Sequence, residues 1–249
     1  MLVDSHCHFS KEYYDDLDEI IINNKKNGIN KMIISGCDKD SIRESILLNK
    51  KYNEIELCLG FHPSEVDLIT DEDINILESL LLENKVVGLG EIGLDYYYTK
   101  ENKDRQIYFF KKQLELAEKL NLPVVIHSRN ATMDTLAILK KHNVKGVIHC
   151  FSDSYETAVE YIKIGFLIGV SGVVTFKNSK LKDIIKRLPI ESIVLETDSP
   201  YLSPEPFRGQ TNSSKNILVI AEYIANIKKL SLEEISNITT NNVKRVYNI

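Results

Sequence analysis

Short apolar runs recur along the chain, and amphipathic segments separate them. The runs are rich in β-branched residues and lack polar alternation, which is typical of strands in a parallel sheet covered by helices. They begin at residues 2–3, 31–34, 56–59, 86–89, 124–126, 146–148, 166–168 and 192–195. Eight such runs, each followed by a helical segment, predict a (β/α)8 barrel.

The helical segments carry their own start and stop patterns. Residues 106–120 place apolar side chains on one helical face, and Asn-Leu-Pro at 121–123 is expected to end that helix. An N-cap at Ser154 and a stop at Gly165 predict another helix. A capping-box pattern at 230–234 opens the last one.

An open doubly wound sheet is the rival fold. Its functional site would lie at one switch point, where the strand order reverses. In this sequence, polar side chains that could bind metal follow many of the predicted strands. A barrel collects the ends of all its strands at one mouth, so this spread favours the barrel. At 249 residues the chain fits one barrel, and we expect a single hydrolase domain over residues 1–249.

Composition narrows the class of protein. A content of 43% hydrophobic and 27% charged residues is usual for a globular domain. The four cysteines lack C-x-x-C spacing, which favours reduced thiols in a cytosolic protein. We expect no signal peptide before the first predicted strand, and no apolar run reaches the roughly 20 residues of a membrane span. We expect a cytoplasmic protein without a membrane and with no obligate protein partner.

The net charge of −5 counts against a generic nucleic-acid-binding surface, which should be basic. It does not exclude a local cationic site. Two divalent ions would bring about +4 to a small cleft.

Histidines and carboxylates stand at the ends of the predicted strands. His6 and His8 are separated by one residue, so an extended strand would place both imidazoles on one face, where they could bind one metal ion. Glu91 follows the run at 86–89 and could bridge two ions, with one oxygen on each. The structural alternatives are a hydrogen-bonded histidine pair in the core and a salt bridge at the barrel mouth.

More residues of the same kind follow later strands. His62, His127 and His149 each close a predicted strand, and Asp198 follows the eighth. Each histidine alone is more often hydrogen-bonded than metal-bound, but together they indicate a metal centre. Asp198 could bind metal and also take a proton from an attacking water. His142, in a lysine-rich stretch, is expected to lie in a solvated helix end.

The candidate ligands offer nitrogen and oxygen donors only. This set suits Zn²⁺ for tight binding, and Mn²⁺ or Mg²⁺ if the site is weak and led by carboxylates. Two ions about 3.5–4 Å apart would polarise a scissile oxygen and lower the pKa of a water between them. Water attack on a phosphoester, an amide or a lactone is the shared reaction class.

Six blocks of sequence contain these residues: Asp-Ser-His-Cys-His from Asp4, Gly-Phe-His-Pro from Gly60, Gly-Glu-Ile-Gly-Leu-Asp-Tyr from Gly90, His-Ser-Arg from His127, His-Cys-Phe-Ser from His149, and Glu-Thr-Asp-Ser-Pro-Tyr-Leu from Glu196. In this order they resemble the TatD family of metal-dependent deoxyribonucleases, within the amidohydrolase-like barrel superfamily. The resemblance runs from Val3 to about Asn212 and implies a (β/α)8 barrel with a two-metal centre.

The resemblance also implies roles for single residues. Its ligands divide into two sets that share one carboxylate: His6, His8 and Asp198 for one divalent ion, His127 and His149 for the other, and Glu91 for both. Asp198 and Glu91 would be the catalytic residues. His62 and Asp95 would face the substrate or lie directly behind the ligands.

A nuclease also needs groups that bind phosphate and bases. Arg129 and Arg208 are the best phosphate partners, because a guanidinium can grip phosphate at two points. The alternative for both is an ordinary salt bridge. Four tyrosines could stack on an unpaired base or simply pack at the rim: Tyr96, Tyr97, Tyr98 and Tyr201.

The sequence departs from the family pattern after Phe207. The family segment usually reads Arg-Gly-Lys, whereas this chain has Arg208-Gly209-Gln210. Losing that cation weakens the argument for phosphate binding and leaves the metal centre untouched.

Together these features predict a metal-dependent hydrolase of the TatD type, a 3′–5′ exodeoxyribonuclease that acts on DNA, single-stranded or at 3′ ends. The alternative is a metal-dependent ester or amide hydrolase acting on a small molecule or on misacylated aminoacyl-tRNA. A third hypothesis, a barrel retained as a scaffold, predicts a missing ligand or base, and none is missing.

Overall fold

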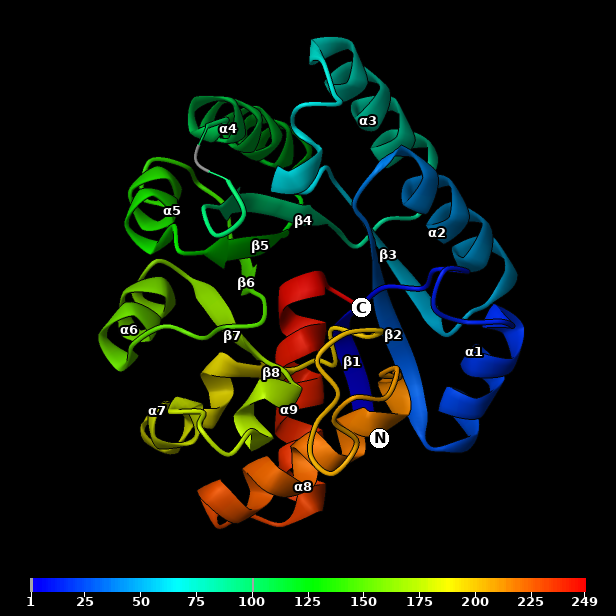
Figure 1. Ribbon diagram of the computed structural model, residues 1–249, viewed down its shortest axis with the longest axis vertical. Helices are drawn as coiled ribbons and strands as arrows, with labels where there is room; N and C mark the ends of the chain where they lie inside the picture. The colour runs from blue at the N-terminus through cyan, green and yellow to red at the C-terminus, as the bar shows by residue number, and fades with distance from the viewer. Residues whose placement is uncertain (1, 100) are drawn as a thin grey trace.

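The computed structural model describes residues 2–99 and 101–249. Within them, eight parallel strands form one sheet whose order follows the chain from β1 to β8 (Figure 1). The strands are β1 (Leu2–Cys7), β2 (Ile29–Gly36), β3 (Ile55–Leu59), β4 (Gly88–Asp95), β5 (Val124–Arg129), β6 (Gly146–Ile148), β7 (Phe166–Val170) and β8 (Ile193–Leu195). A doubly wound sheet reverses its strand order at a switch point, so this consecutive order excludes it and confirms the (β/α)8 barrel.

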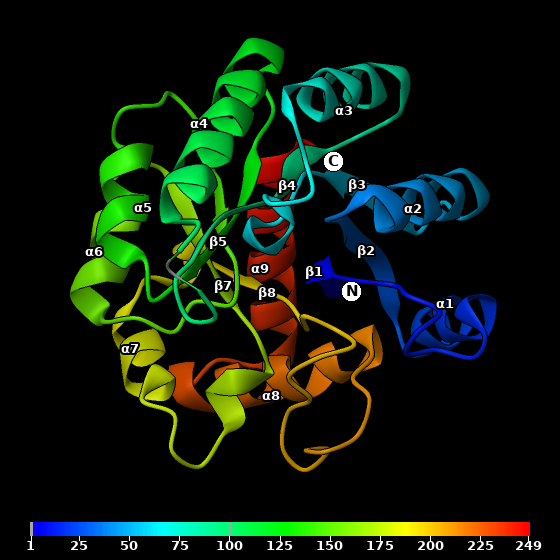
Figure 2. The same ribbon diagram turned by 45° about the horizontal axis from the view of Figure 1, so that its top comes forward.

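Helices alternate with the strands and surround the ring (Figures 1 and 2). They are α1 (Leu17–Lys26), α2 (Lys39–Lys51), α3 (Asp71–Glu83), α4 (Lys103–Leu120), α5 (Thr132–Leu139), α6 (Tyr155–Lys163), α7 (Leu181–Arg187), α8 (Ile217–Lys228) and α9 (Leu232–Tyr247). Short 3₁₀ turns lie in the connections: η1 (Pro63–Glu65), η2 (Gly172–Thr175), η3 (Ile190–Ser192) and η4 (Ser214–Asn216). None of the helices in the described ranges is long and apolar enough to cross a bilayer.

The last helix closes one end of the barrel. α9 lies at the centre of the ring in the view of Figure 1. Its Val243 and Tyr247 pack in one buried cluster with Val3, Val125 and Val194, which come from three different strands. Since these strand residues precede the polar residues of their strands, α9 covers the amino-terminal end. The chemistry is therefore confined to the opposite, carboxyl-terminal mouth.

The ring is completed between β1 and the segment after β8. The backbone N–H of Asp198 donates to the carbonyl of His6 at 3.1 Å, and the N–H of His8 donates to the carbonyl of Ser199 at 2.7 Å. These bonds join the two ends of the sheet. They also place the Asp198 backbone beside both histidines of the first strand.

The predicted end of α4 and the predicted starts of α6 and α9 are confirmed. α4 begins three residues earlier than the sequence suggests and ends at Asn121, which adopts a left-handed conformation with φ 53°. The hydroxyl of Ser154 accepts a hydrogen bond from the backbone of Thr157 at the start of α6. In α9, Ser231 and Glu234 form the reciprocal capping box.

Two kinds of expectation need correction. Glu91 lies inside β4 and His127 inside β5 rather than at the strand ends, because these strands continue to Asp95 and Arg129. The pairing of β4 with β5 shifts register between Leu89 and Ile92, and an irregularity of this kind re-aims side chains. Gly93, with φ 147°, permits β4 to approach β5 closely, since a Cβ there would lie 2.0 Å from the carbonyl oxygen of His127.

His142 is the second correction. Its side chain is only 13% exposed and its Nδ1 lies 3.2 Å from a carboxylate oxygen of Glu118 in α4. The end of α5 therefore packs on α4 instead of standing in solvent. The four cysteines are all free, as the sequence predicts.

Candidate metal centre

Six side chains from five strands or strand ends converge at the barrel mouth. Glu91 of β4 lies at their centre, is 3% exposed, and points its two carboxylate oxygens at different histidine groups. We call the group around Oε2 site A and the group around Oε1 site B. The full set is His6, His8, Glu91, His127, His149 and Asp198.

Site A consists of His6 Nε2, His8 Nε2, Glu91 Oε2 and Asp198 Oδ1. The two nitrogens are 3.1 Å apart. From His6 Nε2, the oxygens of Glu91 and Asp198 lie at 3.4 and 3.5 Å, and from His8 Nε2 they lie at 3.5 and 3.6 Å. Zn–N and Zn–O bonds in a tetrahedral site correspond to ligand separations of about 3.3–3.6 Å. Site A therefore has the size of a four-coordinate metal site.

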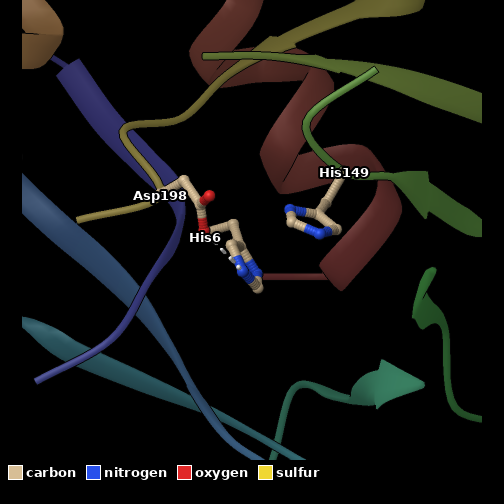
Figure 3. A group of neighbouring side chains, drawn as sticks. All are labelled: His6, His149 and Asp198. Atoms are coloured by element: carbon tan, nitrogen blue, oxygen red, sulfur yellow. Dashed lines mark ion pairs between the residues drawn. The ribbon is translucent and has the colours of Figure 1, made fainter. Parts of the chain in front are cut away.

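Site B consists of Glu91 Oε1, His127 Nδ1 and His149 Nε2. The carboxylate oxygen lies 2.7 Å from His127 Nδ1 and 2.6 Å from His149 Nε2, and these nitrogens are 3.2 Å apart. The ring centroids of His6 and His149 are 4.3 Å apart, so the two sites adjoin. Figure 3 shows His149 facing the pair of His6 and Asp198 across the mouth. Site B offers three ligand atoms, one fewer than site A.

His62 lies at the edge of site B. Its Nε2 is 3.6 Å from Glu91 Oε1, and its ring centroid is 4.5 Å from that of His127. Burial and the neighbouring His127 lower the pKa of His62 to about 3, so the ring is neutral at pH 7. A neutral imidazole here could join the ligands of site B or contact a substrate.

Both histidines of site A have a partner for their second ring nitrogen in one residue, Ser35 at the end of β2. Its hydroxyl lies 3.2 Å from His6 Nδ1 and its carbonyl oxygen 3.1 Å from His8 Nδ1. A hydrogen bond at Nδ1 orients the ring and leaves the lone pair of Nε2 available to a metal ion. Sequence reasoning missed Ser35, although it stands at a strand end like the ligands.

Asp95 lies behind His127. Its Oδ2 is 3.1 Å from His127 Nε2, on the side of the ring opposite Glu91. The side chain of Gln106, in α4, holds the Asp95 backbone by accepting from its N–H and donating to its carbonyl, both at 2.9 Å. Of the two positions that the sequence leaves open for Asp95, the contacts favour the one behind the ligand.

The charges of the centre favour a bound cation. Burial disfavours the charged form of Glu91, yet the surrounding histidines, His149 first, hold its pKa well below the usual range. Burial also disfavours a charged His149, but Glu91 and Glu196 raise its pKa well above the usual value. Hydrogen bonds from His6 and His8 outweigh burial and lower the pKa of Asp198. The carboxylates are therefore negatively charged. Protons on the histidines balance this negative charge, and a divalent cation could balance it instead.

Asp198 lies three residues beyond β8, on a segment tied down by polar contacts. Asp4 accepts hydrogen bonds from the N–H and the hydroxyl of Thr197, at 2.9 and 2.6 Å. The side chain of Asn212 donates to the carbonyls of Thr197 and Tyr201. These buried residues fix the segment against β1. Sequence reasoning did not assign them a role, although Asp4 shares a block with His6 and Asn212 ends the family resemblance.

The predicted phosphate partners lie on the rim. The guanidinium of Arg129 rests over the ring of Tyr97 at 3.8 Å, and that of Arg208 over the ring of Phe176 at the same distance. Among the described residues, neither forms an ion pair or hydrogen bond with site A or site B. Gln210 is exposed at the position where the family usually has lysine.

Tyrosines also border the mouth. Tyr201 is 46% exposed and its ring centroid lies 6.2 Å from that of His8. It stacks edge to face with Tyr13 at 5.4 Å. Tyr97 and Tyr98 are exposed, whereas Tyr96 is buried and donates its hydroxyl to Asp134. Tyr96 therefore packs in the fold and offers no face to a ligand.

The arrangement passes the tests expected of a metal centre. Its donors are imidazole nitrogens and carboxylate oxygens, their spacing in site A matches tetrahedral coordination, and three of its histidines have a hydrogen-bonding partner on the far ring nitrogen. Such a site can hold ions that activate water for hydrolysis.

Comparisons with known proteins agree with this chemistry. The family model of TatD related DNase matches residues 3–248. YabD of Bacillus subtilis (strain 168), an uncharacterized metal-dependent hydrolase, is 40% identical over 254 residues, which cover 100% of both chains. YcfH of Escherichia coli (strain K12), also an uncharacterized metal-dependent hydrolase, is 37% identical over 257 residues, covering 100% of this chain and 96% of YcfH.

A solved structure gives the same result. The crystal structure of YjjV, a TatD homolog from Escherichia coli K12, superposes with a TM-score of 0.93 at 29% identity, covering 100% of this chain and 98% of YjjV. Fold, site and relatives together define a metal-dependent hydrolase built on a (β/α)8 barrel. The chain belongs to the TatD family.

Proposed function

We propose that this hydrolase is a deoxyribonuclease that trims DNA from the 3′ end and uses two divalent ions, one in site A and one in site B. The observation that carries the proposal is the placement of Glu91. Its Oε2 belongs to the group of His6 and His8, and its Oε1 lies 2.7 and 2.6 Å from the nitrogens of His127 and His149. One carboxylate with an oxygen in each of two adjacent ligand groups could bridge two ions, which supports a two-metal hydrolase.

Each ion would take its own ligands besides Glu91. Site A would use His6, His8 and Asp198, and site B would use His127 and His149. When bound, the ions would polarise the scissile phosphate and lower the pKa of the attacking water. Donors of this kind accept Zn²⁺, Mn²⁺ and Mg²⁺.

Asp198 is the proposed general base. One of its oxygens faces His6 Nε2 at 3.5 Å, and the other points away from His6 in Figure 3. Its pKa is lowered, so the carboxylate is unprotonated at neutral pH and can accept a proton from water. The side chain is 13% exposed, which leaves it accessible from the mouth.

Exposed aromatic rings beside the centre support a nucleic-acid substrate. Tyr201 and Tyr13 form an edge-to-face pair next to His8, where an unpaired base could stack. On the other side of the mouth, Arg129 lies on the ring of Tyr97 and keeps the edge of its guanidinium available for a phosphate. A single strand reaches such a mouth more readily than a duplex, which favours single-stranded DNA or frayed 3′ ends.

Two observations favour a second candidate, an ester or amide hydrolase acting on a small molecule or on misacylated aminoacyl-tRNA. The rim carries Gln210 where the family usually has lysine, and the chain has a net charge of −5. Both features reduce the attraction for a polyanion. The two candidates use the same metal centre and differ only in substrate.

The test is a cleavage assay with single-stranded oligonucleotides labelled at the 3′ or the 5′ end, in Mg²⁺, Mn²⁺ or Zn²⁺, with Asp198→Asn as the inactive control. Release of single nucleotides from the 3′ label first, abolished by a chelator and absent in the control, supports the proposal. If the 5′ label is released first, the enzyme degrades DNA from the 5′ end and the proposed direction is wrong. Metal-loaded protein that leaves oligonucleotides intact but hydrolyses an aryl ester or aminoacyl-tRNA selects the second candidate.

A further inference from the structure

A buried carboxylate near site B belongs to neither ligand group. Glu196 follows β8 directly and is 0% exposed. Its Oε1 accepts a hydrogen bond from the backbone N–H of Cys150 and lies 3.7 Å from His149 Nδ1. Its Oε2 and the Nδ1 of His149 are both buried without a hydrogen-bond partner.

Burying a carboxylate without a cation is costly, so a buried one calls for an explanation. Glu56 in β3 offers a comparison, since it is 3% exposed and forms an ion pair with Lys31. In the part of the chain that the structure describes, Glu196 forms no ion pair with a lysine or arginine. His149 is its one ion-pair partner there.

The neighbouring strand makes room for this side chain. A Cβ on Gly169 of β7 would lie 2.4 Å from Glu196 Oε2 and 3.0 Å from the Cα of His149. Any larger residue would push the carboxylate away from the histidine. The missing side chain at Gly169 therefore allows Glu196 to cross from the end of β8, past β7, to the residue that follows β6.

The other histidines of sites A and B show what is missing at His149. His6 and His8 are held from behind by Ser35, and His127 by Asp95. His149 has only Glu196 on its far side. Its Nδ1 is 3.7 Å from that carboxylate, and its Nε2, on the opposite side of the ring, is 2.6 Å from Glu91.

We propose that Glu196 is a positioning residue that accepts the Nδ1–H of His149 and so directs Nε2 into site B. This inference rests on the metal centre of the proposed function, but not on the identity of the substrate. A neutral imidazole carries one N–H, and a carboxylate at Nδ1 keeps the proton there, which leaves the lone pair of Nε2 for a cation. Glu196 would thus set the affinity of site B without touching the ion.

The experiment is a titration of metal-free protein with Zn²⁺ against a competing chelator, for the wild type and Glu196→Gln. Glutamine keeps the shape and the acceptor for Cys150 but removes the charge. We expect one of the two Zn²⁺ ions to bind about 10- to 100-fold more weakly and the other to keep its affinity. Glu56→Gln is the matched control, because it removes another buried carboxylate, near the amino-terminal end of β3 and away from the barrel mouth. It should leave both affinities unchanged.

The outcomes are distinct. If Glu196→Gln binds both ions within about twofold of the wild type, or if Glu56→Gln weakens Zn²⁺ binding equally, the positioning role is wrong. If the wild type itself binds no divalent ion, the metal centre fails and this inference fails with it. An inactive wild type that binds two ions would count against the nuclease alone.

A second measurement covers the case in which Glu196→Gln does not fold. Nitrogen-15 NMR of the Zn²⁺-loaded wild type should show zinc on Nε2 of His149 and a slowly exchanging, downfield proton on Nδ1. Zinc on Nδ1, or an Nδ1 proton that exchanges rapidly with solvent, would overturn the proposal.

Discussion

Asp4 and Thr197 are 193 residues apart in the chain and share two buried hydrogen bonds. Asp4 Oδ1 accepts from the Thr197 N–H at 2.9 Å, and Oδ2 accepts from the Thr197 hydroxyl at 2.6 Å. Thr197 immediately precedes Asp198, and Asp4 is two residues before His6. This pair therefore sets the distance between the proposed base and a histidine of site A.

Thr197→Val tests this link. The substitution keeps the shape of the side chain but leaves a buried oxygen of Asp4 without its donor, so we expect the free energy of unfolding to fall by about 1–3 kcal/mol. Urea unfolding followed by circular dichroism measures it. Thr197→Ser keeps the hydroxyl and is the control. A valine variant as stable as the serine variant would show that the hydroxyl is dispensable.

Glu91→Gln should empty both sites. The glutamine amide has one uncharged oxygen in place of the two carboxylate oxygens of Glu91. Both ligand groups therefore lose the carboxylate that they share. Elemental analysis after dialysis should find about two ions per wild-type chain and far fewer in the variant. Glu83→Gln, at the exposed end of α3, is expected to match the wild type. Two ions retained by Glu91→Gln would refute the bridging role.

Asp198→Asn should reduce turnover while the protein stays folded. Removing a general base costs about 10²- to 10⁴-fold in rate, and the loss of a ligand at site A adds to it. The rate is measured at saturating metal, with occupancy determined in parallel, so that the two effects are separated. Turnover within a few-fold of the wild type would eliminate Asp198 as the base.

Tyr201→Leu should weaken binding of single-stranded DNA. Stacking of one base contributes about 1–3 kcal/mol, which predicts a rise in KM of roughly 5- to 150-fold. The kcat for a small aryl phosphodiester, which has no base to stack, should change little. Tyr108→Leu, an exposed tyrosine on α4, is the control. Equal KM values for both variants would contradict a stacking role for Tyr201.

Glu118→Gln should lower stability at neutral pH but not in acid. The N–H of Asn143 first, and then His142, hold the pKa of Glu118 below its usual range. A lowered folded-state pKa adds stability above the unfolded pKa of about 4.3, and this is lost as pH falls through the folded value. The exposed position limits the decrease in Tm at pH 7 to about 2 °C.

The check is a series of thermal melts between pH 7 and pH 3. Glu115→Gln changes an exposed glutamate on the same helix and should leave the Tm unchanged throughout. A Tm difference between Glu118→Gln and the wild type that grows as pH falls would reverse the predicted sign.

Much of the fold can be predicted from local sequence. The eight apolar runs all correspond to strands, and the ends of α4, α6 and α9 fall where Asn121, Ser154 and Ser231 predict them. These features depend on side chains within a few residues of one another. The ligands are also visible in sequence, because a parallel barrel brings every carboxyl-terminal strand end to one mouth.

The sequence itself thus determined which residues could bind metal. It also determined the barrel that brings them together. The family resemblance also implies how they divide into two ligand sets, and the tertiary structure adds the contacts that orient them. Their orientation depends on the position of Glu91 within the irregular part of β4, and on contacts between distant segments, such as Asp4 with Thr197 and Glu196 with His149. Such contacts leave no periodic pattern in the chain, because they exist only once the ring of strands has closed.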